Sequence, residues 1–136
     1  MTLNIQEIRR KYPSIYDVDV LFTNGESMNI GKDLVIVDYK DLNDMIPDLA
    51  GITLDGAPTY LQPYNVIISI FPSKEIIRFR KDLLITFPHF SQATPWVPHI
   101  FVEAVATEEL KDDLISSLKK IPTRYTVDKI VVKKHD

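Results

Sequence analysis

The hydrophobic positions along the chain follow two different periods, which predict strands and helices in alternation. Runs of β-branched and other apolar residues are typical of strands, and they occur at 18–22, 34–37, 66–71, 100–105 and 125–134. Apolar residues at helical spacing predict two longer helices, at 73–87 and 108–121, which Ser73 and Thr107 can cap. We therefore expect an α+β fold in which helices pack on antiparallel or mixed sheets.

Turn signals refine this pattern. Asn24-Gly25 is a strong hairpin signal and predicts that the first strand turns back into 28–30. Asp55-Gly56 predicts a second turn. In the last helix, the residues expected to face the core form one stripe: Leu110, Leu114, Leu118 and Ile121.

Length and composition narrow the class of protein. The 136 residues suit a single domain, and 45% apolar with 26% charged residues is an ordinary globular composition. The chain has no cysteine and only three histidines, without metal-binding spacing, so no metal and no other cofactor is expected. A net charge of −3 argues against a broad nucleic-acid-binding surface. The apolar runs are too short to span a bilayer, so we expect a cytoplasmic protein with no membrane partner.

His99 is the histidine whose position suggests chemistry. It stands at the start of the strand 100–105, after the stiff segment Trp96-Val97-Pro98. A rigid approach can hold an imidazole at a strand end, and a pKa near 6.5 suits general acid or base catalysis on a phosphodiester. A histidine beside a proline is also compatible with a purely structural role.

Several segments together resemble a known family. Leu54-Asp55-Gly56 is similar to a strand-end motif, Pro72-Ser73-Lys74-Glu75 to the start of a helix, and Trp96-Val97-Pro98-His99-Ile100 to a W-x-P-H motif. Their order, over about residues 50–134, resembles the two-histidine phosphoesterases, which include the 2′,5′-RNA ligase-like proteins. The resemblance implies a bilobal fold within the single domain 1–136, with a shortened first lobe at 1–58 and a second lobe at 59–136.

The resemblance also implies a metal-free mechanism, in which two H-x-T motifs face each other across a cleft. One histidine is the base and the other the acid, and the threonines hold phosphate oxygens. The chain departs from this pattern because Phe101 replaces the threonine after His99, and residues 1–88 contain no histidine. Depending on the alignment, Asp19 or Asp33 stands where the first histidine is expected. The residues proposed to bind a phosphate-bearing ligand are Arg78, Arg80, Trp96 and Arg124.

Three functions follow as hypotheses. The missing histidine and threonines favour a non-catalytic domain of this fold, a pseudoenzyme that binds a protein partner or assembles as a homo-oligomer. Its partner surface is expected at Tyr60, Pro63 and Tyr64, or on the aromatic loop with Phe87, Phe90 and Trp96. The first alternative is a divergent phosphodiesterase that acts on cyclic nucleotides or RNA ends through His99. The second is an RNA-binding module that uses its basic and aromatic residues.

Overall fold

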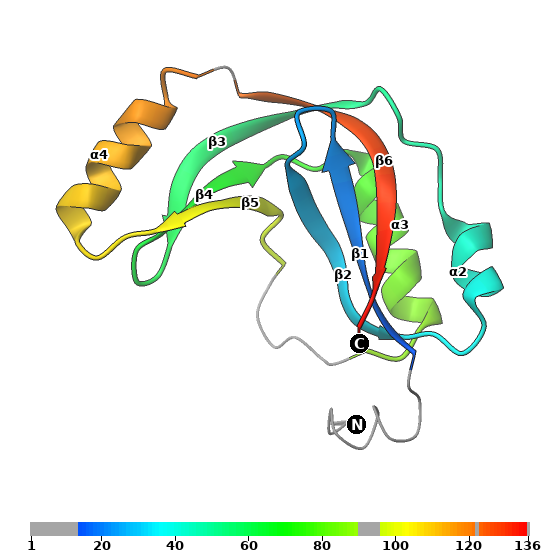
Figure 1. Ribbon diagram of the computed structural model, residues 1–136. Coiled ribbons are helices and arrows are strands. Elements are labelled where there is room, and N and C mark those ends of the chain that lie inside the picture. Colours follow the sequence, from blue (N-terminus) through cyan, green and yellow to red (C-terminus); the bar gives the residue numbers. More distant parts are fainter. Residues whose placement is uncertain (1–13, 90–95, 122, 136) are drawn as a thin grey trace.

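The computed structural model describes residues 14–89, 96–121 and 123–135, and it has an α+β fold (Figure 1). Six strands form one sheet in the order β2-β1-β6-β3-β4-β5, and every neighbouring pair is antiparallel. The strands are β1 (Ile15–Phe22), β2 (Ser27–Val35), β3 (Thr53–Leu61), β4 (Asn65–Ile70), β5 (His99–Ala104) and β6 (Arg124–Lys134). The helices of the described residues are α2 (Tyr39–Met45), α3 (Lys74–Thr86) and α4 (Glu108–Leu118). The expected fold class is confirmed.

The last strand, β6, joins the two parts of the sheet. It pairs with β1 from Tyr16↔Lys134 to Phe22↔Val127, and with β3 from Thr53↔Thr126 to Asp55↔Arg124. The boundary expected between residues 58 and 59 falls inside β3. The two expected lobes therefore share strands of one continuous sheet.

The main core lies between the sheet and α3. Ser73 caps this helix by accepting a hydrogen bond from the backbone N–H of Ile76, which satisfies one of the free donors at the helix start. Ile76, Phe79 and Leu83 are buried on one face of α3. They belong to the same cluster as the inward-facing residues of β1 and β2, namely Val18, Val20, Phe22, Met28, Ile30 and Leu34. In Figure 1, α3 lies behind β1, β2 and β6.

The hairpin predicted at Asn24-Gly25 is confirmed. Gly25 has φ of +91°, the left-handed region that favours glycine, and β1 and β2 pair on either side of the turn. The apolar runs at 28–30 and 34–37 are not separate strands, because β2 extends continuously from Ser27 to Val35.

The turn predicted at Asp55-Gly56 is wrong, because β3 runs straight through these residues. A Cβ atom at Gly56 would lie 2.7 Å from Cγ2 of Ile68 and 3.1 Å from the Tyr125 ring. Glycine stands there because neighbouring side chains approach the backbone closely, and not because the chain reverses. The reversal occurs later, at residues 62–64.

The stripe predicted for the last helix is also wrong in part. Leu110 and Ile121 are 51% and 57% exposed, and α4 ends at Leu118, before Ile121. The buried residue of α4 is Lys111, which is only 6% exposed. Among the residues that the model describes, no helix is long and apolar enough to cross a membrane.

Candidate functional site

His99 begins β5, as expected, and is directly opposite Ser69 of β4. Its Nδ1 atom lies 2.6 Å from the backbone carbonyl oxygen of Val97. This contact occupies one ring nitrogen and holds the imidazole against its own chain segment. Phe101 shares its face of the sheet, two residues along the strand, and is 57% exposed. The position that would carry a phosphate-binding hydroxyl therefore presents an apolar ring.

The two candidate carboxylates have other partners. Asp19 on β1 accepts a hydrogen bond of 2.9 Å from the amide of Asn29 and lies 3.3 Å from the ammonium of Lys133. Asp33 on β2 lies beside His135, with 3.7 Å between its Oδ1 and the ring Nδ1. Within the described residues, neither carboxylate is hydrogen-bonded or ion-paired to His99. Each of the three groups therefore has its own local partner, and their pairing as acid and base stays a prediction.

Two of the four proposed ligand-binding residues do come together. The Arg80 guanidinium carbon lies 4.6 Å from the centre of the Trp96 ring, a cation–π geometry. The Trp96 indole N–H donates to the backbone oxygen of Asn29 at 3.4 Å, so the segment before β5 is fixed across β2. Partial burial lowers the pKa of Arg80, since desolvation disfavours its charged form. Even so, an arginine side chain stays protonated in proteins.

The other two lie apart from this contact. Arg78 is exposed on α3. Arg124 begins β6, and its Nε atom lies 3.5 Å from Asp55 in an exposed ion pair. Such a pair contributes little to stability, because both groups remain in water. Arg80 and Trp96 therefore contact each other, whereas no contact among the described residues joins Arg78 or Arg124 to them.

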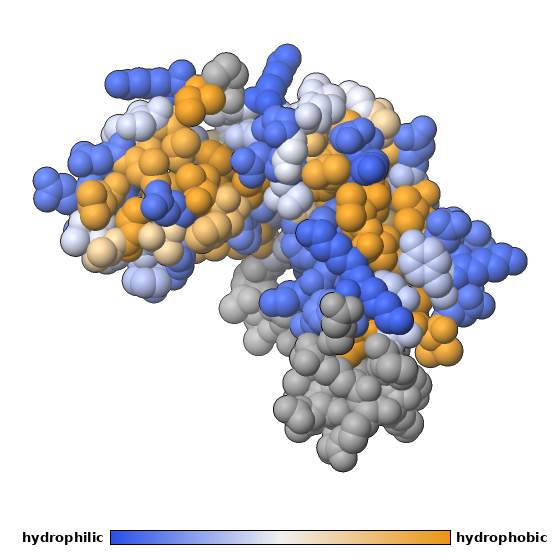
Figure 2. Space-filling model, in the orientation of Figure 1, coloured by the Kyte–Doolittle hydropathy of each residue, from blue (hydrophilic) through white to orange (hydrophobic). Residues whose placement is uncertain are grey.

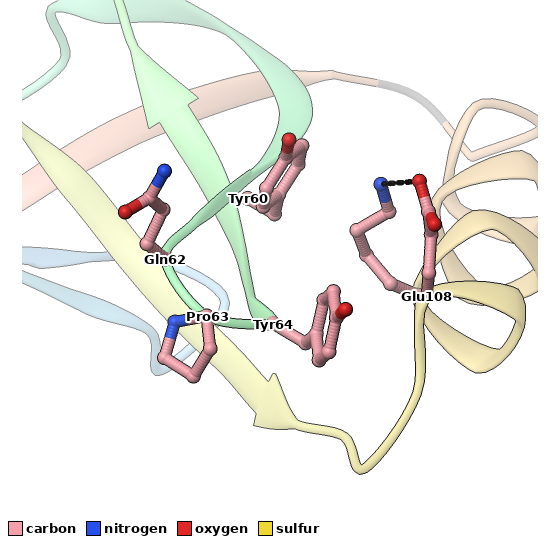
Figure 3. A pocket seen from close by; sticks show the side chains of 6 residues that line it. Tyr60, Gln62, Pro63, Tyr64 and Glu108 are labelled. Atoms are coloured by element: carbon pink, nitrogen blue, oxygen red, sulfur yellow. Dashed lines mark ion pairs between the residues drawn. The ribbon is translucent and has the colours of Figure 1, made fainter.

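A pocket of about 550 Å³ lies elsewhere, between the β3–β4 turn and the start of α4 (Figure 3). Its lining residues are Tyr60 from the end of β3, Gln62, Pro63 and Tyr64 from the turn, and Glu108 and Lys111 from α4. In Figure 3 the rings of Tyr60 and Tyr64 lie on the side of the turn that faces the helix. The partner surface predicted at Tyr60, Pro63 and Tyr64 therefore coincides with a pocket.

Local contacts fix the two sides of this pocket. The backbone N–H of Val105 donates to the carbonyl of Tyr64 at 3.0 Å, which ties the turn to the segment that enters α4. Thr107 then caps α4 by accepting from the N–H of Leu110 at 3.2 Å. Glu108 follows in the first turn, with a side chain that is 72% exposed. The pocket therefore presents two aromatic rings beside an accessible carboxylate.

Lys111 closes one side of the pocket. Its ammonium lies 4.0 Å from the centre of the Tyr60 ring, 3.0 Å from Asp112 and 4.0 Å from Glu108. The hydrogen bond to Asp112 raises the pKa of Lys111, and nearby negative charges act in the same direction. The lysine is thus held by an aromatic face and two carboxylates, which keeps a charged residue buried on α4.

The sequence indicated that the turn could belong to a binding surface, but it did not indicate that α4 would contribute to the same pocket. Two tyrosines around a proline marked residues 60–64 as a surface that could bind a partner. Nothing in the spacing of α4 indicated that Glu108 and Lys111 would complete the pocket, because their neighbours come from β3 and from the β3–β4 turn. The stripe predicted from helical periodicity did not include Lys111.

Comparison of the chain with protein-family models gives no match, and comparison with curated proteins gives none either. The likeness to two-histidine phosphoesterases therefore rests on the sequence motifs alone and stays a prediction. The candidate site has to be judged from the geometry of its own residues.

Arg80→Ala is expected to shift the fluorescence emission of the protein to longer wavelength. Trp96 is the single tryptophan, and removal of the guanidinium uncovers one face of its ring to water. Arg78→Ala removes the same charge from an exposed position of the same helix and is expected to leave the emission unchanged. An unchanged spectrum in Arg80→Ala would show that the two side chains do not stack in solution.

Proposed function

We propose that this chain is a non-catalytic binding domain, and that the pocket formed by Tyr60, Tyr64 and Glu108 takes up a segment of a protein partner. The observation that carries this proposal is the coincidence of the predicted partner surface with a pocket. Its volume is within the range of about 300–1,000 Å³ that is usual for binding sites. The engagement of Asp19 and Asp33 with other residues supports the non-catalytic part of the proposal.

The chemistry of the lining favours one kind of partner segment. Tyrosine rings beside a proline offer flat apolar faces with hydroxyl groups at their edges, and Gln62 adds an amide. Surfaces of this kind bind extended proline-containing segments, which lose little entropy on binding because their backbone is already restricted. The exposed Glu108 carboxylate favours a basic residue next to the prolines.

Hydrophobic surface near the pocket agrees with a protein partner. Figure 2 shows hydrophobic residues gathered over the end of the molecule that carries β5 and α4. Phe101 on β5 and Leu110 on α4 are each more than half exposed. Contacts with such side chains can extend an interface beyond the pocket, since buried apolar area is a main source of binding free energy.

The binding proposal predicts a selective loss of affinity in Tyr64→Ala. Labelled synthetic peptides of the pattern Pro-x-x-Pro, with and without an adjacent arginine, are titrated with the protein and followed by fluorescence anisotropy. We expect binding of the arginine-containing peptides, weakened at least about tenfold, or ~1.4 kcal/mol, by Tyr64→Ala. The matched control is Tyr39→Ala, because Tyr39 is also exposed but contacts Tyr16 on the other part of the sheet.

Glu108→Gln adds a second arm to this titration and is expected to remove the preference for arginine while binding to the prolines remains. Equal affinity in the Tyr64→Ala and wild-type proteins would contradict the proposed pocket. Failure of every Pro-x-x-Pro peptide to bind would contradict the proposed chemistry of the partner.

The non-catalytic assignment predicts no turnover of 2′,3′-cyclic nucleotides or of 2′,5′-linked RNA above the level of a His99→Ala variant. The reason is that Asp19 and Asp33, the groups at the position of the missing histidine, are engaged with Lys133 and His135, whereas the reaction needs both an acid and a base. Product formation measured by chromatography tests this. Turnover by the wild-type protein that disappears in His99→Ala would establish the phosphodiesterase alternative.

A further inference from the structure

Three polar side chains meet on one face of the sheet, away from the pocket. They are Asp17 of β1, Asp33 of β2 and His135, which directly follows β6. The three strands are neighbours in the sheet, and Figure 1 shows the end of β6 beside the start of β1 and the end of β2. Each residue offers one atom that can bind a metal ion, and these atoms all lie within 4.8 Å of one another.

Backbone contacts hold the three residues in place. The N–H of His135 donates to the carbonyl of Ile15 at 2.7 Å, which extends the pairing of β6 with β1 past the last strand residue. The N–H of Asp33 donates to Oδ1 of Asp17 at 2.9 Å. Asp33 has φ of +53° at an irregularity in the β1–β2 pairing, and such bulges can redirect a side chain relative to its strand.

One imidazole nitrogen of His135 makes no hydrogen bond inside this cluster. Its Nε2 atom is removed from solvent and has no hydrogen-bond partner among the described residues. Oδ2 of Asp17 is only 2.9 Å away, so the contact is close enough for an ion pair but too poorly aligned for a hydrogen bond. A buried nitrogen that makes no hydrogen bond is costly, and coordination of a cation would satisfy it.

The charges of the cluster also favour a bound cation. Two carboxylates face one imidazole, and the side chain of Asp33 is only 12% exposed. Lys133 is opposite Asp17 in the register, yet its ammonium is paired with Asp19 at 3.3 Å. A divalent cation would neutralise the charges of both carboxylates, which pair with no lysine or arginine among the described residues.

We propose that Asp17, Asp33 and His135 bind a divalent transition-metal ion such as Zn²⁺. One imidazole and two carboxylates form a ligand set suited to first-row transition metals, whereas Ca²⁺ and Mg²⁺ prefer oxygen ligands throughout. Three protein ligands leave further coordination positions for water or a ligand group. The site is independent of the proposed pocket, because it shares no residue with it.

The test uses the full chain, freed of any affinity tag and of metal. Its melting temperature is measured with ZnCl₂ and with MgCl₂ at equal concentrations, and Zn²⁺ affinity is measured by calorimetry. Zn²⁺ is expected to raise the melting temperature, since a ligand that binds only the folded state stabilises it. Co²⁺ is expected to give visible d–d absorption bands on binding.

Two variants and one control locate the ion. His135→Gln and Asp33→Asn are each expected to weaken Zn²⁺ binding by more than about tenfold; asparagine tolerates the positive φ of residue 33. His99→Gln removes a histidine elsewhere and is expected to bind Zn²⁺ as the wild type does. No Zn²⁺ binding by the wild type, equal binding in His135→Gln, or an equal response to Mg²⁺ would overturn the proposal.

Discussion

The pairing of β6 with both β1 and β3 is the interaction on which the rest of the molecule depends. Among the described strands, the ladders of β6 alone join the β1–β2 hairpin to the three strands β3, β4 and β5. A two-stranded hairpin alone is marginally stable in water, and a sheet needs three or more strands or a packed helix. Because β6 comes last in the chain, the sheet is completed only when its C-terminal strand inserts between strands formed from the first half.

The pairing of β6 also determines where the two proposed sites lie. The end of β6 brings His135 to Asp17, over a separation of more than one hundred residues in the chain. The start of β6 pairs with β3, and β3 leads to the turn whose tyrosines line the pocket. The proposed metal site and the proposed peptide pocket are therefore on different parts of one sheet. Their chemistries also differ: carboxylates and an imidazole in one, aromatic rings and an accessible carboxylate in the other.

Local sequence signals predicted the first hairpin turn and the helix caps correctly, but they did not predict contacts between residues far apart in the chain. The hairpin at Asn24-Gly25 and the caps Ser73 and Thr107 depend on neighbouring residues only, and all three are confirmed. Gly56 was assigned to a turn because a glycine needed for close packing looks the same in sequence as one needed for a reversal. The burial of Lys111 was not predicted, because its contact with the Tyr60 ring is known only once β3 and α4 are placed together. The cluster around His135 was not predicted for a related reason, since histidine spacing cannot detect ligands that come from β1, from β2 and from the end of β6.

The most direct test of the account is native-state hydrogen exchange along β6. If this strand completes the sheet, the amides between Val127 and Val132 that are hydrogen-bonded to β1 exchange only by global unfolding, with the same free energy of opening as the core amides of β1. The account would be contradicted if these β6 amides exchanged through a separate opening of lower free energy while β1 and β2 stayed protected.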